Sequence, residues 1–183
     1  MKHFLMGSLL IAASAAIMPA TAMAQLRDGP AITGYGKTFP TVGAHQRPDA
    51  KIRYRVLFNI TKAAMTPDKP NPSLEKVARF MNLLAIDGVK PSAGDIVAIV
   101  HGPATPSIVQ DTAYAKKTGG KSNPNLPLIA QLKAAGVTVA VCDQALQGQG
   151  FTEDEVVKDV RVDVAALTTL ATLQLQGWAL IPD

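Results

Sequence analysis

Residues 137–144 constrain the fold most strongly, because they join a buried-strand pattern to the only cysteine of the chain. Residues 137–141 are apolar or β-branched, and they follow Gly136, which ends a helical pattern over residues 127–135. A helix, a glycine and then a continuous apolar strand are typical of a sheet that is buried on both faces. The pattern predicts a short buried strand that carries Cys142 to its carboxyl end.

The same alternation of strand and helix recurs along the chain. Further strands are predicted at residues 53–60, 95–100, 160–162 and 178–181, and helices at residues 72–87, 106–114, 127–135 and 164–176, with one more after Thr152. About five strands and five helices in alternation predict an α/β fold. The fold class is a three-layer α/β/α, flavodoxin-like arrangement with a mostly parallel sheet of about five strands.

Local signals refine this pattern. Asn71 is predicted to cap the first helix, with Pro72 at its first position. Asp163 is a candidate cap for the Ala- and Leu-rich helix at residues 164–176, which is expected to be largely buried. Residues 116–123 and 144–150 are predicted to be loops.

The first 24 residues have the features of a secretory signal peptide. Lys2 begins a short basic segment, an apolar run follows, and Ala22-Met-Ala24 supplies a small-x-small cleavage site. Cleavage after Ala24 would remove 24 of the 183 residues and leave 159. The chain is therefore expected to be periplasmic or secreted and free of the membrane after cleavage. An uncleaved membrane anchor is the alternative.

The mature chain is predicted to begin with an arm at residues 25–50, ahead of an α/β domain at residues 51–183. The arm is rich in Gly and Pro and has no helical or strand period. Disorder is one reading of such a composition. Partial docking on the domain, or on a neighbouring subunit, is the other, supported by the apolar residues Ile32, Tyr35, Phe39 and Val42.

Composition excludes several functions. The formal net charge of +4 comes mostly from scattered Lys and Arg, so no nucleic-acid partner is predicted. The sequence lacks a Gly-x-Gly-x-x-Gly fingerprint, a Walker loop and a Gly-x-Ser-x-Gly elbow. His45 and His101 are the only histidines after the predicted cleavage site, too few with one cysteine for a structural zinc site. No cofactor or metal is predicted.

A single cysteine cannot form an intramolecular disulfide. In an exported protein it indicates a reactive thiol, an intermolecular bridge or a buried inert residue. The absence of a second cysteine also excludes a Cys-x-x-Cys dithiol mechanism.

In a parallel sheet, the residues that follow different strands meet at one rim. The predicted rim consists of Asn59, Thr61, His101, Gly102, Cys142 and Asp143. A histidine and an acid beside a thiol favour the thiolate, so Cys142 is the candidate catalytic residue, with His101 and Asp143 in support. Plainer roles remain open: Cys142 as a small core residue, His101 as a loop cap, Gly102 in a tight turn and Asp143 in solvent.

Several segments resemble the DsrE/DsrF family, and more closely its exported branch. They are Asn71-Pro-Ser-Leu-Glu75, Val77-Ala-Arg-Phe-Met-Asn-Leu83, Val100-His-Gly-Pro-Ala104, Asn123-Pro-Asn-Leu-Pro-Leu-Ile129, Gly136-Val-x-Val-x-Val-Cys142 and Leu173-Gln-x-Gln-Gly-Trp-Ala-Leu180. The resemblance covers the whole mature chain. It implies a three-layer α/β fold and a homo-oligomer, a trimer or a hexamer of two stacked trimers.

The resemblance also implies a function. In the sulfur-relay members a cysteine accepts sulfane sulfur as a persulfide and passes it on, and this role is carried over to Cys142 alone. The chain is thus predicted to be a periplasmic sulfur carrier, sulfurtransferase-like if it turns over, with donor and acceptor proteins as partners. The alternative is a non-catalytic oligomeric binding or scaffold module in which Cys142 is structural.

Overall fold

A computed structural model describes residues 25–183, so the predicted signal peptide lies outside the described residues. Within them, five strands form one sheet in which each neighbouring pair is parallel. The strands are β1 (Val56–Ile60), β2 (Ile96–Val100), β3 (Thr138–Cys142), β4 (Arg161–Asp163) and β5 (Ala179–Ile181), in the order β4-β3-β2-β1-β5. The predicted α/β fold class is confirmed.

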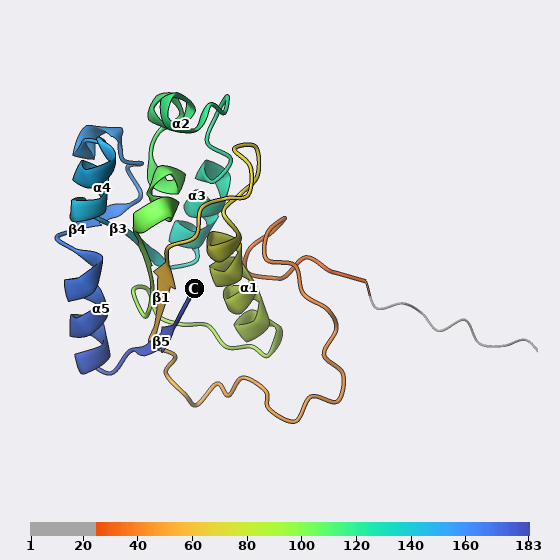
Figure 1. The fold of residues 1–183 in the computed structure, drawn as a ribbon. Coiled ribbons are helices and arrows are strands. Elements are labelled where there is room, and N and C mark those ends of the chain that lie inside the picture. Colours follow the sequence, from red (N-terminus) through yellow and green to blue (C-terminus); the bar gives the residue numbers. More distant parts are fainter. Residues whose placement is uncertain (1–24) are drawn as a thin grey trace, which may run out of the picture.

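Helices cover both faces of this sheet, as Figure 1 shows. On one face lie α1 (Pro72–Ile86) and α3 (Leu126–Ala134), and on the other lies α5 (Ala166–Leu175). The chain moves from β1 through β4 in one direction and returns to β5 in the other, so crossovers of the usual right hand are expected to place α1 and α3 on one face and α5 on the other. The remaining segments follow the carboxyl ends: α2 (Asp111–Thr118), α4 (Asp143–Gln149) and two 3-10 segments, Gly102–Ile108 and Glu153–Glu155.

The two faces bury unequal cores. The face toward α1 and α3 holds most of the buried side chains, including Phe58, Leu74 and Ile129. The face toward α5 holds a smaller buried cluster: Leu57, Val97, Ile99, Ala140, Cys142 and Ala166. Because strand side chains alternate between faces, Cys142 belongs to the α5 side, together with every second residue before it.

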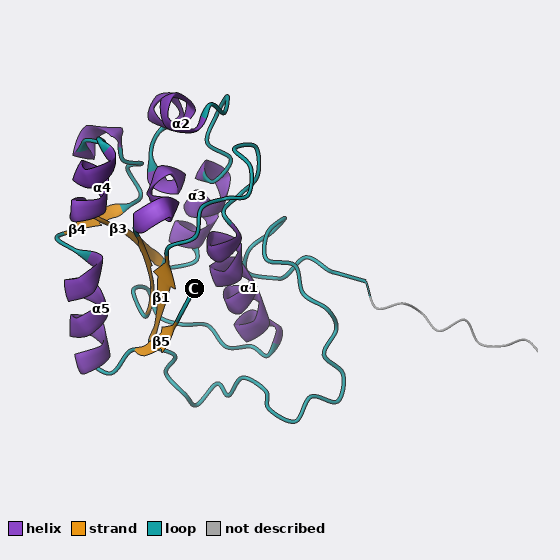
Figure 2. Cartoon of the chain, in the orientation of Figure 1, coloured by secondary structure: helices purple, strands orange, loops and turns teal. Residues whose placement is uncertain are grey.

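The arm docks on the domain through one buried amide. Asn82 of α1 is fully buried, its Oδ1 accepts from the Ile32 amide at 2.7 Å, and its Nδ2 donates to the carbonyls of Ile32, Tyr35 and Gly36. Ile32 is itself buried, whereas Phe39 and Val42 are exposed. Partial docking is therefore found for residues 29–38. The following loop is mostly exposed and is drawn as a wide excursion in Figure 2, but it returns to the end of α1, where Arg47 Nε donates to Asp87 Oδ1 at 2.9 Å.

The start of α1 matches its prediction. Asn71 is the N-cap, and its Oδ1 accepts from the amides of Ser73 at 2.9 Å and Leu74 at 3.4 Å. Pro72 occupies the first turn, where its missing N–H costs nothing.

Three local predictions are wrong. Residues 106–114 form no single helix, because the Pro-rich segment takes the 3-10 form up to Ile108 and α2 begins only at Asp111. Lys116 and Lys117 belong to the last turn of α2, so the loop there is shorter than predicted. Residues 144–150 are mostly helical in α4, because Leu146 packs into the core and Gly150 supplies the left-handed cap.

The last helix also differs from its prediction. Only Ala166 of α5 is buried, and Leu167 and Leu175 are 80% and 89% exposed. α5 is the outermost layer on this face, and no segment within residues 25–183 covers its outer side. Asp163 does not cap α5, because its carboxylate accepts from Arg161 and from the Thr169 hydroxyl instead.

Candidate functional site

The strand register brings the predicted rim residues together. Ile60 pairs with Val100 and Val100 with Val141, so His101 lies beside Cys142 one position further along. Cys142 in turn pairs with Asp163 of β4. Neighbouring strands lie about 4.8 Å apart, so His101, Cys142 and Asp163 form one row across the carboxyl edge.

His101 is fixed by its neighbour on β1. Its backbone is extended and its amide donates to the Ile60 carbonyl at 2.9 Å, which continues the ladder between β1 and β2. Nε2 lies 2.6 Å from Asn59 Oδ1. An amide oxygen only accepts, so Nε2 carries the proton in this contact and Nδ1 is left as the acceptor of the neutral ring.

The ionisation of His101 reflects its burial. Desolvation lowers the pKa of the imidazole below its usual range, and the negative charge of Asp183 nearby opposes this shift only in part. The neutral ring is therefore favoured, which keeps Nδ1 available as a base.

Cys142 is almost fully covered. It is 6% exposed and packs with Leu57, Ile99 and Ala166 on the face toward α5. In the described part of the chain its sulfur hydrogen-bonds neither ring nitrogen of His101. The structure thus brings Cys142 and His101 into one row without joining them by a direct hydrogen bond.

The two other predicted rim residues of this region are held in local contacts. Asp143 begins α4, and its Oδ2 accepts from Gln147 Nε2 at 2.6 Å on the exposed side of that helix. Gly102 has a φ of 53°, the left-handed turn conformation that favours glycine. Its carbonyl accepts from Thr105 Oγ1 at 2.8 Å and from Gln149 Nε2 at 2.5 Å, which ties α4 to the loop after β2.

The sequence reasoning missed two acids at this edge. Asp163 pairs with Cys142 in register, and Asp183 places its carboxylate at the end of β1. There the amide and hydroxyl of Thr61, the amide of Lys62 and the hydroxyl of Ser73 all donate to it, and Lys76 Nζ lies 3.5 Å away. The rule that parallel strands end at one rim, applied to β4 and β5, would have found both.

Hydrogen bonding governs the ionisation of Asp183. Burial alone would raise the pKa of this carboxyl, but the donors from Ser73, Thr61 and Lys62 outweigh it and hold the pKa well below its usual range. Asp183 is thus a stable carboxylate.

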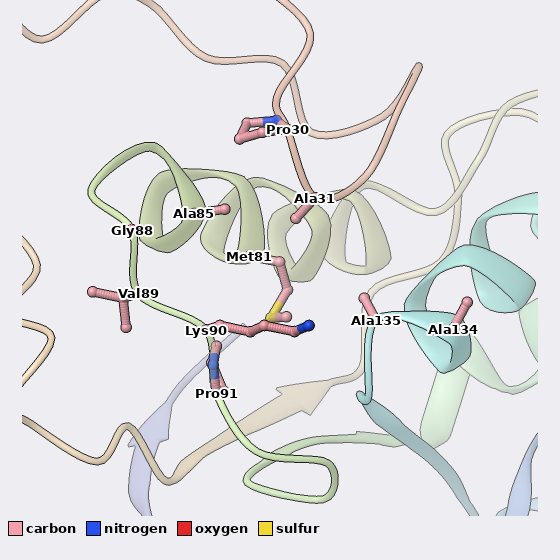
Figure 3. A pocket seen from close by; sticks show the side chains of 10 residues that line it. All are labelled: Pro30, Ala31, Met81, Ala85, Gly88, Val89, Lys90, Pro91, Ala134 and Ala135. Carbon is pink, nitrogen blue, oxygen red and sulfur yellow. The ribbon is translucent and has the colours of Figure 1, made fainter.

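An apolar pocket lies elsewhere. It has a volume of about 410 Å³ and lies between the arm, α1, the loop before β2 and the end of α3. Figure 3 shows that its lining side chains are apolar apart from Lys90. Gly88 to Pro91 precede β2 and Ala135 precedes β3, so this pocket lies near the amino ends of the strands, away from Cys142.

Among residues 25–183, no group of three or more His, Cys, Asp or Glu side chains is placed to hold a metal ion. Within the same residues, none of the helices has the length and apolar character needed to cross a bilayer.

Comparison with known proteins identifies the family of this chain. Residues 48–182 match the DsrE/DsrF-like family. The chain belongs to this family. A search of curated proteins found no match.

Two solved structures share the DsrE-like fold. One is a protein of unknown function, MTH1491 from Methanobacterium thermoautotrophicum, with 21% identity and a TM-score of 0.51. The other is the ychN protein from E. coli, with 15% identity and a TM-score of 0.51. Each alignment covers 71% of this chain and 99% of the other. At these identities the likeness establishes the fold alone.

Proposed function

We propose that this DsrE-like protein carries sulfane sulfur as a persulfide on Cys142. The row at the carboxyl edge supports this proposal most strongly, because it sets the only cysteine of the chain between His101 and Asp163. Ligands of parallel α/β sheets gather at this edge. Family membership supports the same chemistry, since sulfur relay is associated with DsrE-like proteins.

The proposed exchange is balanced without an external oxidant. The Cys142 thiolate attacks the outer sulfur of a persulfide or polysulfide donor, one S–S bond forms at Cys142, and one S–S bond breaks as the donor leaves as a thiolate. An acceptor thiolate then takes the outer sulfur by the same reaction. His101 Nδ1 is the proposed acceptor of the thiol proton, because Nε2 is engaged with Asn59. Asp143, held on α4 by Gln147, stays a predicted supporting acid.

The proposal includes location and assembly. We propose export after cleavage behind Ala24, and a homo-oligomer that meets separate donor and acceptor proteins. The exposed apolar residues Val164, Leu167 and Leu175 on and beside α5 support subunit or partner contacts on that face.

A second function is favoured by one observation. Cys142 is only 6% exposed and packs among apolar side chains, as a structural cysteine does. In that case the protein is a non-catalytic binding or scaffold module, and the Cys142 sulfur reacts with nothing until the fold opens.

Intact-mass measurement separates the two functions. The protein is treated with polysulfide, and Cys142→Ala is the matched variant without a thiol. One added sulfur atom on the native chain, removable by a reductant and absent from Cys142→Ala, supports the sulfur carrier. If neither polysulfide nor an alkylating agent modifies Cys142 until denaturant is added, the structural cysteine replaces that proposal.

A test of His101 follows from the same assay. His101→Gln should slow persulfide formation most strongly near neutral pH, because it removes the base. His45→Gln is the matched control, since His45 is exposed and lies in the loop of the arm.

A further inference from the structure

The carboxylate of Asp183 is held like a bound ligand. Its Oδ2 accepts from Thr61 N at 2.7 Å, Thr61 Oγ1 at 3.0 Å and Lys62 N at 2.6 Å. Its Oδ1 accepts from the Ser73 hydroxyl and lies 3.5 Å from Lys76 Nζ. The side chain is only 5% exposed, so these donors replace water around the charge almost completely.

We call the four residues that supply these donors, Thr61, Lys62, Ser73 and Lys76, the cradle. A buried amide holds the cradle in shape without using its donors. Asn71 is fully buried, and its Nδ2 donates to the Lys62 carbonyl at 2.7 Å and to Ser107 Oγ at 3.1 Å. The Asn71 amide donates in turn to Asn125 Oδ1 at 2.7 Å. The bond to the Lys62 carbonyl restrains the backbone of Lys62, whose N–H lies on the preceding peptide and donates to the carboxylate, so the cradle is preorganised for an anion.

The cradle lies where α/β sheets bind ligands. The strand order runs from β4 to β1, and the chain returns to the other side of β1 only with β5. Such reversals, at the carboxyl ends of strands, form the crevices that hold small molecules in open α/β sheets. Ser73 also lies in the first turn of the 15-residue α1, whose dipole favours a negative charge.

Asp183, whose carboxylate occupies the cradle, is joined to the sheet by a short strand. Asp183 follows β5, a three-residue strand at the edge of the sheet, which among residues 25–183 pairs with β1 alone. Figure 1 shows this end of the drawn chain, labelled C, beside β1 and α1. Withdrawal of Asp183 therefore needs little of the sheet to open, beyond the bond from Lys76 Nζ to the Pro182 carbonyl, and it leaves the cradle's donors without their acceptor.

We propose that the cradle is a binding site for a small oxyanion with at least two terminal oxygens, and that the Asp183 carboxylate is its tethered, displaceable occupant. The two oxygens of such an anion take the places of Oδ1 and Oδ2. Thr61 lies next to His101 in register, so a bound anion stands on the same edge as Cys142. The proposed binding of an anion to the cradle does not depend on whether Cys142 carries sulfur.

Calorimetric titration with sodium sulfate, at constant ionic strength, tests the proposal. In Asp183→Ala the tethered competitor is gone, and sulfate should bind saturably, about tenfold or more tightly than to the unchanged protein. Sodium acetate, titrated in parallel, distinguishes a site for carboxylates from one for tetrahedral anions. Asp159→Ala is the matched control, because it removes an exposed acid of equal charge.

Two further variants complete the test. Adding Ser73→Ala and Lys76→Ala to Asp183→Ala should weaken sulfate binding to the level of the unchanged protein. If Asp183→Ala does not fold, Asp183→Asn keeps the acceptor oxygen, lacks the charge and should still yield to sulfate. The proposal would be overturned if sulfate binding never saturates, or if it is equal in the Asp183 variants and the Asp159→Ala control. Asp183 would then serve only to hold the end of β5 against β1 and α1.

Discussion

The ends of β1 and β3 lie on one edge of the sheet, and each places a covered side chain there, yet they differ in polar chemistry. The side chain of Asp183 at the end of β1 is 5% exposed although the residue as a whole is half-buried, and the whole residue Cys142 at the end of β3 is 6% exposed. The carboxylate accepts from four donors and lies 3.5 Å from Lys76 Nζ, whereas the thiol lies among apolar side chains. A buried charge must be paired, while a buried thiol need not be. Burial alone therefore does not distinguish a reactive group from a structural one.

The largest expected effect comes from removing the amide that supports the β1 end. Asn71→Ala leaves buried partners at Lys62 and Ser107 unsatisfied and uncaps α1, so the free energy of unfolding should fall by about 3 kcal/mol. Chemical denaturation measures this change. Asn71→Ser keeps a capping oxygen and should recover about 1 kcal/mol of it. Equal losses for both variants would mean that the cap contributes nothing.

Asp183→Asn should have the next largest effect, because it weakens hydrogen bonds to a charged acceptor. We expect a loss of about 2 kcal/mol in the free energy of unfolding at neutral pH. The folded pKa of Asp183 is depressed, so its contribution is complete above the unfolded value of about 4 and is lost as the pH falls through the folded value. Denaturation between neutral pH and strong acid should show a steeper decline for the unchanged protein than for Asp183→Asn.

These contacts show what the sequence could predict and what it could not. Apolar β-branched runs predicted the three central strands, β1, β2 and β3, because a strand buried on both faces has a pattern that few other structures share. The same topology predicted that His101 and Cys142 would meet at one edge. It could not predict that Cys142 would be covered, since burial depends on the side chains of α5 and β1 packed against it.

Helix boundaries and tertiary partners were harder to predict. α4 was missed because its sequence is short and polar, and its stabilising contacts are tertiary: Leu146 is buried against the core and Gln149 donates to the Gly102 carbonyl. Burial of α5 was overestimated because an Ala- and Leu-rich sequence does not show how many layers will cover a helix. Asp183 lies 122 positions from Thr61 in sequence, so no local motif could indicate their contact.

At the β3 end, Cys142→Ser is expected to cost more than Cys142→Ala. Both lose the sulfur's packing, but serine also places a hydroxyl among Leu57, Ile99 and Ala166. The difference in unfolding free energy should be about 1 kcal/mol. Comparing thermal unfolding of the two variants measures it. If serine is the more stable, a polar partner reaches this position, and the contrast with the β1 end is smaller than the structure indicates.

The smallest expected effect is on the pH dependence of stability, and it arises at His101, which lies between the ends of β1 and β3. Burial depresses its folded pKa, so the protein binds this proton less readily than the unfolded chain, and stability falls as the pH drops from about 6.5 through the folded value. Because the Asp183 charge partly offsets this shift, Asp183→Asn should enlarge the loss between neutral and mildly acidic pH. His101→Gln should remove it, and His45→Gln should leave it unchanged. A loss that is the same in Asp183→Asn and the unchanged protein would show that the β1 end does not act electrostatically on the row that contains Cys142.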